Sequence, residues 1–183
     1  MLILGCGNRQ RGDDAAGILA AERLRAIGIT AEVCAGEASE LMHAWSVADD
    51  VIVIDAVVTG APAGTVHVWD GQHLPAFATS TGSSHGLGVA QAIGLARALD
   101  CLPARLRVYG IEAKRFELGS EVSPEVERAV EEVVRRIAGG RGKSLIYQRS
   151  LEVMKEVLRR REKRELRPGE FAFTEFVFSK RLG

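Results

Sequence analysis

The sequence lacks several features that would assign a protein to a class at once. Its three cysteines, Cys6, Cys34 and Cys101, are widely spaced and form no CxxC motif. This usage fits a reducing compartment, in which cysteines act as small buried hydrophobic residues. No stretch of about eighteen uncharged apolar residues exists, which excludes a membrane span. The apolar residues 1–7 are too few for a signal peptide and have no basic flank, so we expect a cytoplasmic protein.

An excess of charge of either sign is also missing. Lys plus Arg and Asp plus Glu both number 24 in 183 residues, so nothing favours a nucleic-acid partner or an acidic tail. Hydrophobic residues make up 46% and charged residues 26%, which is ordinary for a globular protein. The length allows one domain with a substantial core. We expect neither a nucleic acid nor a membrane as partner.

Three common functional motifs are either absent or lack the structural context that they require. The GCGN segment at residues 5–8 lacks the third glycine of GxGxxG, and no acid clearly ends the next predicted strand, so a dinucleotide site is disfavoured. Residues 82–86, GSSHG, match GxSxG in letters, but they lie at the end of a predicted polar loop, 71–84, and not directly after a strand, so we expect no nucleophile elbow and a serine hydrolase is disfavoured. No HExxH is present, so an ordinary zinc-protease site is excluded.

The hydrophobic pattern alternates between strands and helices. Short apolar, β-branched runs predict strands, and amphipathic spacing predicts helices, the last beginning at a Ser-Pro-Glu start signal. The predicted strands are 2–4, 30–34, 51–54, 65–69 and 106–111, and the helices are 15–27, 39–48, 87–99 and 124–137. This order predicts a three-layer α/β fold, with a mostly parallel twisted sheet and helices on both faces. Ligands of such sheets bind at the carboxyl ends of the strands.

The composition changes near residue 141, which divides the chain into a main domain, 1–140, and a C-terminal extension, 141–183. Residues 150–164 predict a highly charged amphipathic helix, and residues 171–178 predict a strand with four of the six phenylalanines. A lone helix and strand cannot bury a core of their own. We expect them to lie on the main domain, on a partner or on a second copy, so self-association is one hypothesis; a flexible tail is the alternative.

Three polar residues lie at predicted element boundaries. Asp14 follows the first strand, Asp55 follows the apolar run 51–54, and His85 precedes a helix. Two carboxylates and an imidazole at one sheet edge could bind a divalent metal through O, O and N ligands.

Each of these residues also has a structural interpretation. Asp13 or Asp14 could cap the following helix. Asp55 could bind a loop backbone, and His85 could merely neighbour a helix start. The remaining histidines, His43, His67 and His73, have no companion carboxylate pattern, and we interpret them as structural or solvent-facing.

An ordered set of motifs resembles one family, the hydrogenase maturation endopeptidases. The set spans about residues 1–138, and no single motif in it is specific. Its members are GCGN at 5–8, GDDAAG at 12–17, IDA at 54–56, SHGLG at 84–88, YGIE at 109–112, LG at 118–119 and VSPEV at 122–126.

The resemblance implies a three-layer α/β metal-dependent endopeptidase. Its substrate would be the nickel-loaded precursor of a nickel–iron hydrogenase large subunit, from which it removes a short C-terminal extension. The family's triad falls on Asp14, Asp55 and His85, with Asp13 as an alternative to Asp14. Nickel supplied by the substrate, or another divalent metal in its place, would complete this site.

Two other functions stay open on the sequence. One is a different α/β hydrolase of similar fold, such as a spore-type endopeptidase or a nucleosidase-like enzyme. The other is a non-proteolytic nickel-sensing or chaperone module that binds a hydrogenase subunit. The chain also departs from the family at Ala113 and Lys114, where a proline and an acid are frequent. We expect this departure to have little effect, because that strand end holds none of the three ligands.

Overall fold

The computed structural model describes residues 1–74 and 86–140. The described elements alternate between strands and helices, as predicted. In chain order they are β1 (Leu2–Cys6), the 3-10 helix η1 (Gly12–Ala15), α1 (Ala16–Ala26), β2 (Glu32–Cys34), α2 (Ala38–Trp45), β3 (Asp50–Val57), β4 (Val66–Asp70), the 3-10 helix η2 (Gly71–His73), α3 (Gly86–Ala98), β5 (Arg105–Glu112) and α4 (Pro124–Gly139).

The five strands form one sheet in the order β2-β1-β3-β5-β4. The first four in this order are parallel, and β4 pairs antiparallel with β5 at the edge. The central strand β3 is buried from Val51 to Ala56, as expected of a parallel strand that is covered on both faces. The carboxyl ends of β1, β3 and β5 meet at one edge of the sheet.

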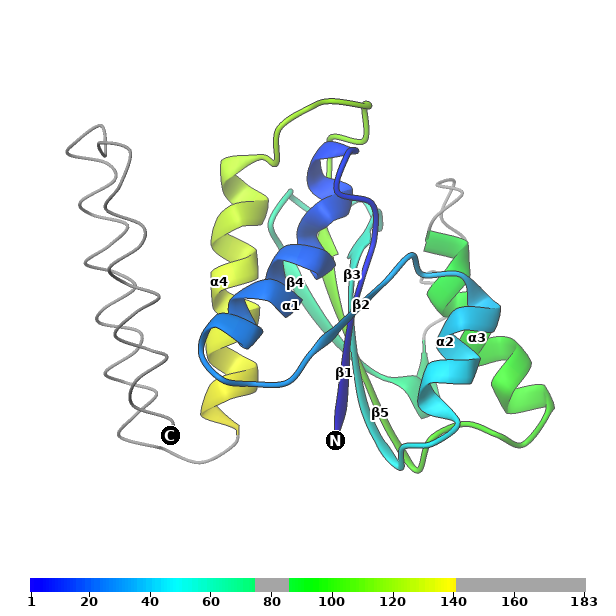
Figure 1. The fold of residues 1–183 in the computed structure, drawn as a ribbon. Helices are drawn as coiled ribbons and strands as arrows, with labels where there is room; N and C mark the ends of the chain where they lie inside the picture. The colour runs from blue at the N-terminus through cyan, green and yellow to red at the C-terminus, as the bar shows by residue number, and fades with distance from the viewer. Residues whose placement is uncertain (75–85, 141–183) are drawn as a thin grey trace. The chain divides into compact units, whose positions relative to one another are not determined.

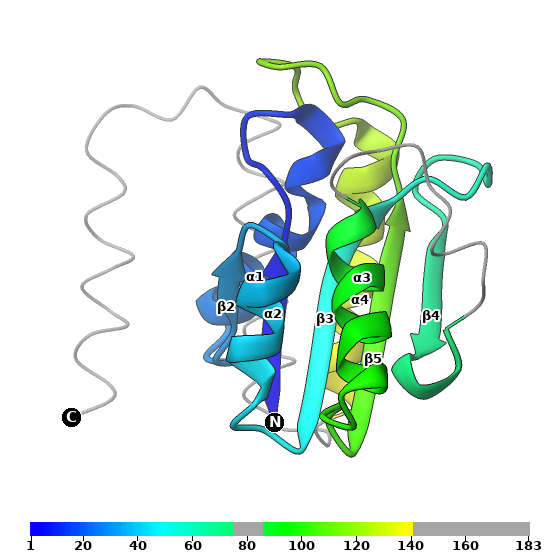
Figure 2. The same cartoon turned by 90° about the vertical axis from the view of Figure 1, so that its right-hand side faces the viewer.

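Helices cover both faces of the sheet (Figures 1 and 2). α1 and α4 lie on one face, and α2 and α3 lie on the other. The buried cluster on the α2–α3 face includes Val51 and Val53 of β3, so by alternation Asp55 belongs to the same face. The three-layer, mostly parallel α/β fold is therefore confirmed.

The amphipathic pattern of α4 shows why its position was predictable. Its buried residues recur at spacings of three and four, which places them on one side of the helix. They are Val126, Ala129, Val130, Val133, Val134, Ile137 and Ala138. Pro124 opens the helix as expected, but the side chain of Ser123 makes no cap hydrogen bond.

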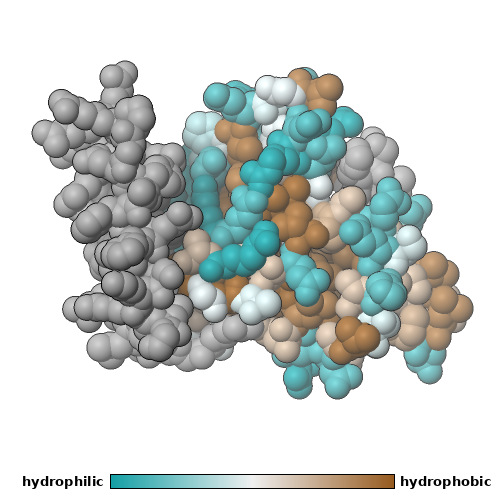
Figure 3. Space-filling model, viewed as in Figure 1, coloured by the Kyte–Doolittle hydropathy of each residue, from teal (hydrophilic) through white to brown (hydrophobic). Residues whose placement is uncertain are grey.

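Apolar side chains also reach the surface of the α2–α3 layer. Val47, Leu95 and Leu99 are exposed, and apolar colour is visible over this layer in Figure 3. Among the cysteines, Cys6 and Cys34 are buried, but Cys101 is exposed, so the expectation of three buried cysteines is wrong for Cys101. It follows Asp100, whose positive φ of 53° marks the turn after α3.

The predicted C-terminal extension, 141–183, lies outside the described residues. Its helix, its strand and its role in self-association therefore stay predictions, as does the boundary at residue 140. Among residues 1–74 and 86–140, no helix is long and apolar enough to cross a membrane.

Candidate active site

Close backbone packing positions the first acidic loop over the sheet. A Cβ atom on Gly17 of α1 would lie 2.2 Å from the Ile54 carbonyl oxygen and 2.3 Å from that of Cys6. A Cβ on Gly5 would in turn meet the Gly17 carbonyl oxygen at 2.1 Å. These contacts leave no room for side chains, so the start of α1 lies directly on β1 and β3. η1, which carries both acids of the first loop, is thereby held beside the end of β3.

A third glycine shapes the loop itself. Gly7 has a φ of +131°, and a Cβ there would lie 1.8 Å from the Asp14 carbonyl oxygen. The Asn8 amide donates to the same oxygen at 3.2 Å. The GCGN and GDDAAG motifs are thus parts of one folded unit.

The two neighbouring acids have different partners. Asp13 is fully buried, and its carboxylate accepts three backbone N–H bonds from the loop between β5 and α4. Its Oδ2 accepts from Lys114 and Arg115, each at 3.0 Å, and its Oδ1 accepts from Ser123 at 2.6 Å. Asp13 therefore ties η1 to a loop that is about a hundred residues away in sequence.

The N-cap interpretation of these acids is wrong, and both lie in the first turn of η1 instead. Neither η1 nor α1 has a side-chain cap, and the residue before α1 is Ala15. The physical reason is the contact just described, since the Asp13 carboxylate satisfies amides of another loop. The β5–α4 loop also contains Ala113 and Lys114, the two residues that depart from the family pattern. The contact of Lys114 with Asp13 is made by its backbone amide and not by its side chain.

Asp14 and Asp55 form a buried acidic pair. They are 2% and 6% exposed. The pKa of Asp55 is raised to about 8, first by burial and then by the negative charge of Asp14, while the Ala56 N–H, 2.9 Å from Asp55 Oδ1, opposes the rise. Among the residues that the structure describes, no cationic side chain lowers this pKa. Two buried carboxylates that repel each other electrostatically favour a cation between them or a shared proton.

Asp55 lies inside its strand and not after it. β3 continues to Val57, and Asp55 is the register partner of Gly110 on β5. The apolar run ends at Ile54 in the sequence, but pairing with β5 extends the strand by three residues. The predicted loop-backbone contact is instead a bond to the adjacent amide within β3.

His85 lies outside the described residues, and α3 begins at the next residue, Gly86. The described part of the chain holds two of the three proposed ligands, and within it no group of three His, Cys, Asp or Glu side chains is placed to hold a metal. The Asp14–Asp55–His85 set therefore stays a prediction, of which the acidic pair is described.

A fourth buried carboxylate was missed as a candidate. Glu112, at the end of β5, is 2% exposed. Its Oε1 accepts from the Thr59 and Gly60 amides at 2.7 and 2.9 Å, and its Oε2 accepts from Thr59 Oγ1 at 2.8 Å. Glu112 thus fixes the loop that follows β3.

Two histidines do have companion carboxylates. His67 Nε2 lies 3.2 Å from Glu112 Oε2, and its ring stacks on Trp69 at 5.0 Å. The exposed His73 lies 3.1 Å from Asp70 Oδ2. The His67–Glu112 contact could not be seen in the sequence, because it depends on the pairing of β4 with β5. The His73–Asp70 contact is local in sequence and was missed.

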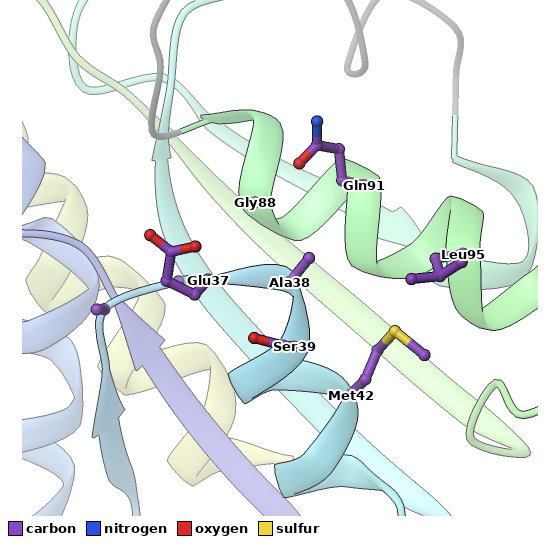
Figure 4. A pocket seen from close by; sticks show the side chains of 9 residues that line it. Glu37, Ala38, Ser39, Met42, Gly88, Gln91 and Leu95 are labelled. Atoms are coloured by element: carbon purple, nitrogen blue, oxygen red, sulfur yellow. The ribbon is translucent and has the colours of Figure 1, made fainter.

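A pocket of about 600 Å³ lies between the β2–α2 connection and α3. Figure 4 shows Met42 of α2 and Leu95 of α3 on its apolar side and Glu37, Ser39 and Gln91 as its polar side chains. The pocket does not include Asp14 or Asp55. It is a separate hollow beside the helix that follows His85.

The fold and the buried pair define a three-layer α/β protein with an acidic site at the carboxyl edge of its sheet. Residues 35–139 match the family model described as hydrogenase maturation protease. The chain belongs to this family and is a peptidase.

Similarity to known proteins supports this family assignment. The chain is 28% identical over 143 residues to the hydrogenase 2 maturation protease of Escherichia coli (strain K12), covering 75% of this chain and 87% of that protein. It is similar to the structure of the hydrogenase maturating endopeptidase HybD from E. coli, with 26% identity, a TM-score of 0.64 and coverage of 76% and 90%. It also resembles the [NiFe] hydrogenase maturation protease HybD from Thermococcus kodakarensis, with 29% identity, a TM-score of 0.60 and coverage of 78% and 98%.

Proposed function

We propose that this peptidase removes the C-terminal extension from the nickel-loaded precursor of a nickel–iron hydrogenase large subunit, in the cytoplasm. Asp14, Asp55 and His85 recognise the nickel that the substrate carries. The observation that carries the proposal is the buried Asp14–Asp55 pair at the carboxyl edge of a hydrogenase maturation protease fold.

The pair has the chemistry of a cation site. At neutral pH the raised pKa of Asp55 keeps a proton on the pair when no cation is present. A divalent cation favours the ionised carboxylate, so binding of nickel would release this proton. Carboxylate oxygens combined with one imidazole nitrogen suit several divalent metals. The site is therefore expected to respond to the metal that the precursor carries.

His85 is the proposed nitrogen ligand. Asp55 belongs to the α2–α3 face of the sheet, and α3 begins directly after His85, which supports placing an imidazole near the pair. The N-terminus of a helix lowers the pKa of an adjacent histidine and favours its neutral, ligating form.

The rest of the chain holds the pair in position. Gly17 allows α1 to contact the backbone of β3, and Asp13 binds the β5–α4 loop to η1. The carboxylates are consequently preorganised on rigid elements rather than on a free loop. Nickel bound near the scissile bond would polarise its carbonyl or lower the pKa of a water molecule.

The test compares two forms of one precursor, nickel-loaded and nickel-free, incubated with the full-length protein. We expect the nickel-loaded form alone to lose the mass of its C-terminal extension. His85→Ala should abolish the loss, whereas the matched control His43→Ala, at an exposed position of α2, should process like wild type.

Other outcomes separate the alternatives. Equal cleavage of both precursor forms would contradict nickel recognition while leaving the protease activity in place. Stable binding of the nickel-loaded precursor without any mass loss would contradict the proposal and favour a chaperone.

A further inference from the structure

Two cysteines on neighbouring strands lie side by side at the carboxyl ends of those strands, the same end of the sheet as the acidic pair. Cys6 ends β1 and Cys34 ends β2, and the two residues are register partners of parallel strands. Both are buried, at 0% and 6% exposure. Both pack in the hydrophobic core, and neither is among the residues of the proposed peptidase site.

The geometry of the pair is close to that of a disulfide. The two Sγ atoms are 2.9 Å apart. Neighbouring strands of a sheet are about 4.8 Å apart, and disulfides join Cα atoms that are about 4.4–6.8 Å apart. The sulfurs need to approach by only about 0.9 Å to reach the disulfide bond length. Formation of the bond therefore requires little movement of the backbone.

The two thiols differ in reactivity. The pKa of Cys34 is lowered, chiefly by its hydrogen bond with Cys6 and also by the backbone N–H of Gly36, while burial opposes the shift. The pKa of Cys6 is raised, first by the same hydrogen bond and then by burial. Cys34 is also the more accessible of the two. A small oxidant would therefore reach Cys34 first, and Cys6 would react second.

We propose that Cys6 and Cys34 are a redox modification site, at which a peroxide converts the two thiols reversibly into a disulfide. The Cys34 thiolate attacks one oxygen of hydrogen peroxide, which breaks the O–O bond and gives a sulfenic acid and hydroxide. The Cys6 sulfur then attacks the Cys34 sulfur and displaces the second hydroxide. The two thiol protons neutralise both hydroxides, so two thiols and one peroxide give one disulfide and two waters. A dithiol reductant reverses the change.

The bond would fix the loop beside the peptidase site. Cys34 leads into Gly36, where an added Cβ would lie 3.5 Å from the Cys6 Cβ. A Cβ on Gly88 of α3 would lie 1.8 Å from the Gly36 carbonyl oxygen. The β2–α2 loop thus packs on Cys6 on one side and on the first turns of α3 on the other. The disulfide closes a loop of 28 residues, which should raise the melting temperature by on the order of 5–10 °C.

The experiment treats the full-length native protein with hydrogen peroxide, blocks remaining thiols by alkylation and maps the cysteines by peptide mass spectrometry. We expect one linked pair, Cys6 with Cys34, that has lost two hydrogen atoms, while Cys101 is alkylated. Dithiothreitol should restore three alkylatable thiols. Protein first unfolded in urea should instead give a mixture of the three possible pairs. The difference between the two samples shows that the fold selects the Cys6–Cys34 pair.

Two variants complete the test. Cys101→Ser should keep the linked pair, and Cys34→Ser should abolish both the link and the rise in melting temperature. Native wild-type protein in which Cys6 and Cys34 both remain alkylatable after peroxide would overturn the proposal. A mixture of pairs from native protein, the same as from unfolded protein, would also overturn it.

Discussion

Replacing Asp13 by alanine should destabilise the fold more than replacing its neighbour, Asp14. The Asp13 carboxylate accepts three backbone N–H bonds that join η1 to the β5–α4 loop. A hydrogen bond to a charged group contributes about 1.5–3 kcal/mol, and a buried donor that loses its acceptor costs about 1–3 kcal/mol. Residues 114 and 115 are exposed, so their amides can bind water in the variant, whereas Ser123 is fully buried.

We therefore expect Asp13→Ala to lower the free energy of unfolding by about 3–5 kcal/mol, a large part of the total for a domain. Asp14→Ala should cost clearly less, because it also removes the charge that opposes ionisation of Asp55. Asp13→Asn keeps one acceptor oxygen, so its loss in free energy of unfolding should lie between those of Asp13→Ala and Asp14→Ala. Urea unfolding followed by circular dichroism measures all three variants. A loss below about 1 kcal/mol in Asp13→Ala would refute the anchoring role.

Three further predictions concern pH, metal content and the C-terminal extension. Because the folded-state pKa of Asp55 is about 8 rather than 3.8, the folded protein keeps a proton that the unfolded chain releases. The free energy of unfolding should then fall between pH 4 and 8 by up to about 1.4 kcal/mol per pH unit and level off above pH 8. Asp55→Asn should lack this fall when both proteins are unfolded in urea with chelator present. The same dependence on pH in variant and wild type would refute the raised pKa of Asp55. Purified protein should carry little metal by elemental analysis, since three side chains without a closed cage bind divalent ions weakly; a stoichiometric, chelator-resistant zinc would contradict this. Limited proteolysis should spare residues 143–183, because we expect them to dock on the main domain, on a partner or on a second copy; rapid trimming to about residue 141 with unchanged activity would show that the extension is neither docked nor needed.

Local patterns made much of the fold predictable. The apolar run of β3 and the three-and-four spacing of α4 follow directly from burial on one or both faces, so their positions were predicted within three residues. The antiparallel edge strand β4 and the strand order depend on pairing between distant segments, which no local pattern contains. The end of β3 shows the same limit, because pairing with β5 carries it past the polar Asp55.

The site was predictable to a smaller extent. Motif order pointed to Asp14 and Asp55, and both lie buried at one sheet edge. The role of Asp13 could not be read locally, since its partners are 101 to 110 residues away. The same holds for Glu112, whose partners lie on the β3–β4 loop and β4, and for the Cys6–Cys34 contact, which depends on strand register.

The central claim is that the buried acidic pair is required for cleavage of the nickel-loaded precursor. The most direct test compares two variants of the same strand, Asp55→Asn and Asp50→Asn. Asp50 is the first residue of β3, at the opposite end from Asp55, and its contact with Arg105 is at the surface. With urea unfolding confirming that both variants are folded, we expect Asp55→Asn to lower the processing rate by at least about 100-fold and Asp50→Asn to leave it unchanged. A folded Asp55→Asn variant that processes the precursor at the wild-type rate would contradict the account.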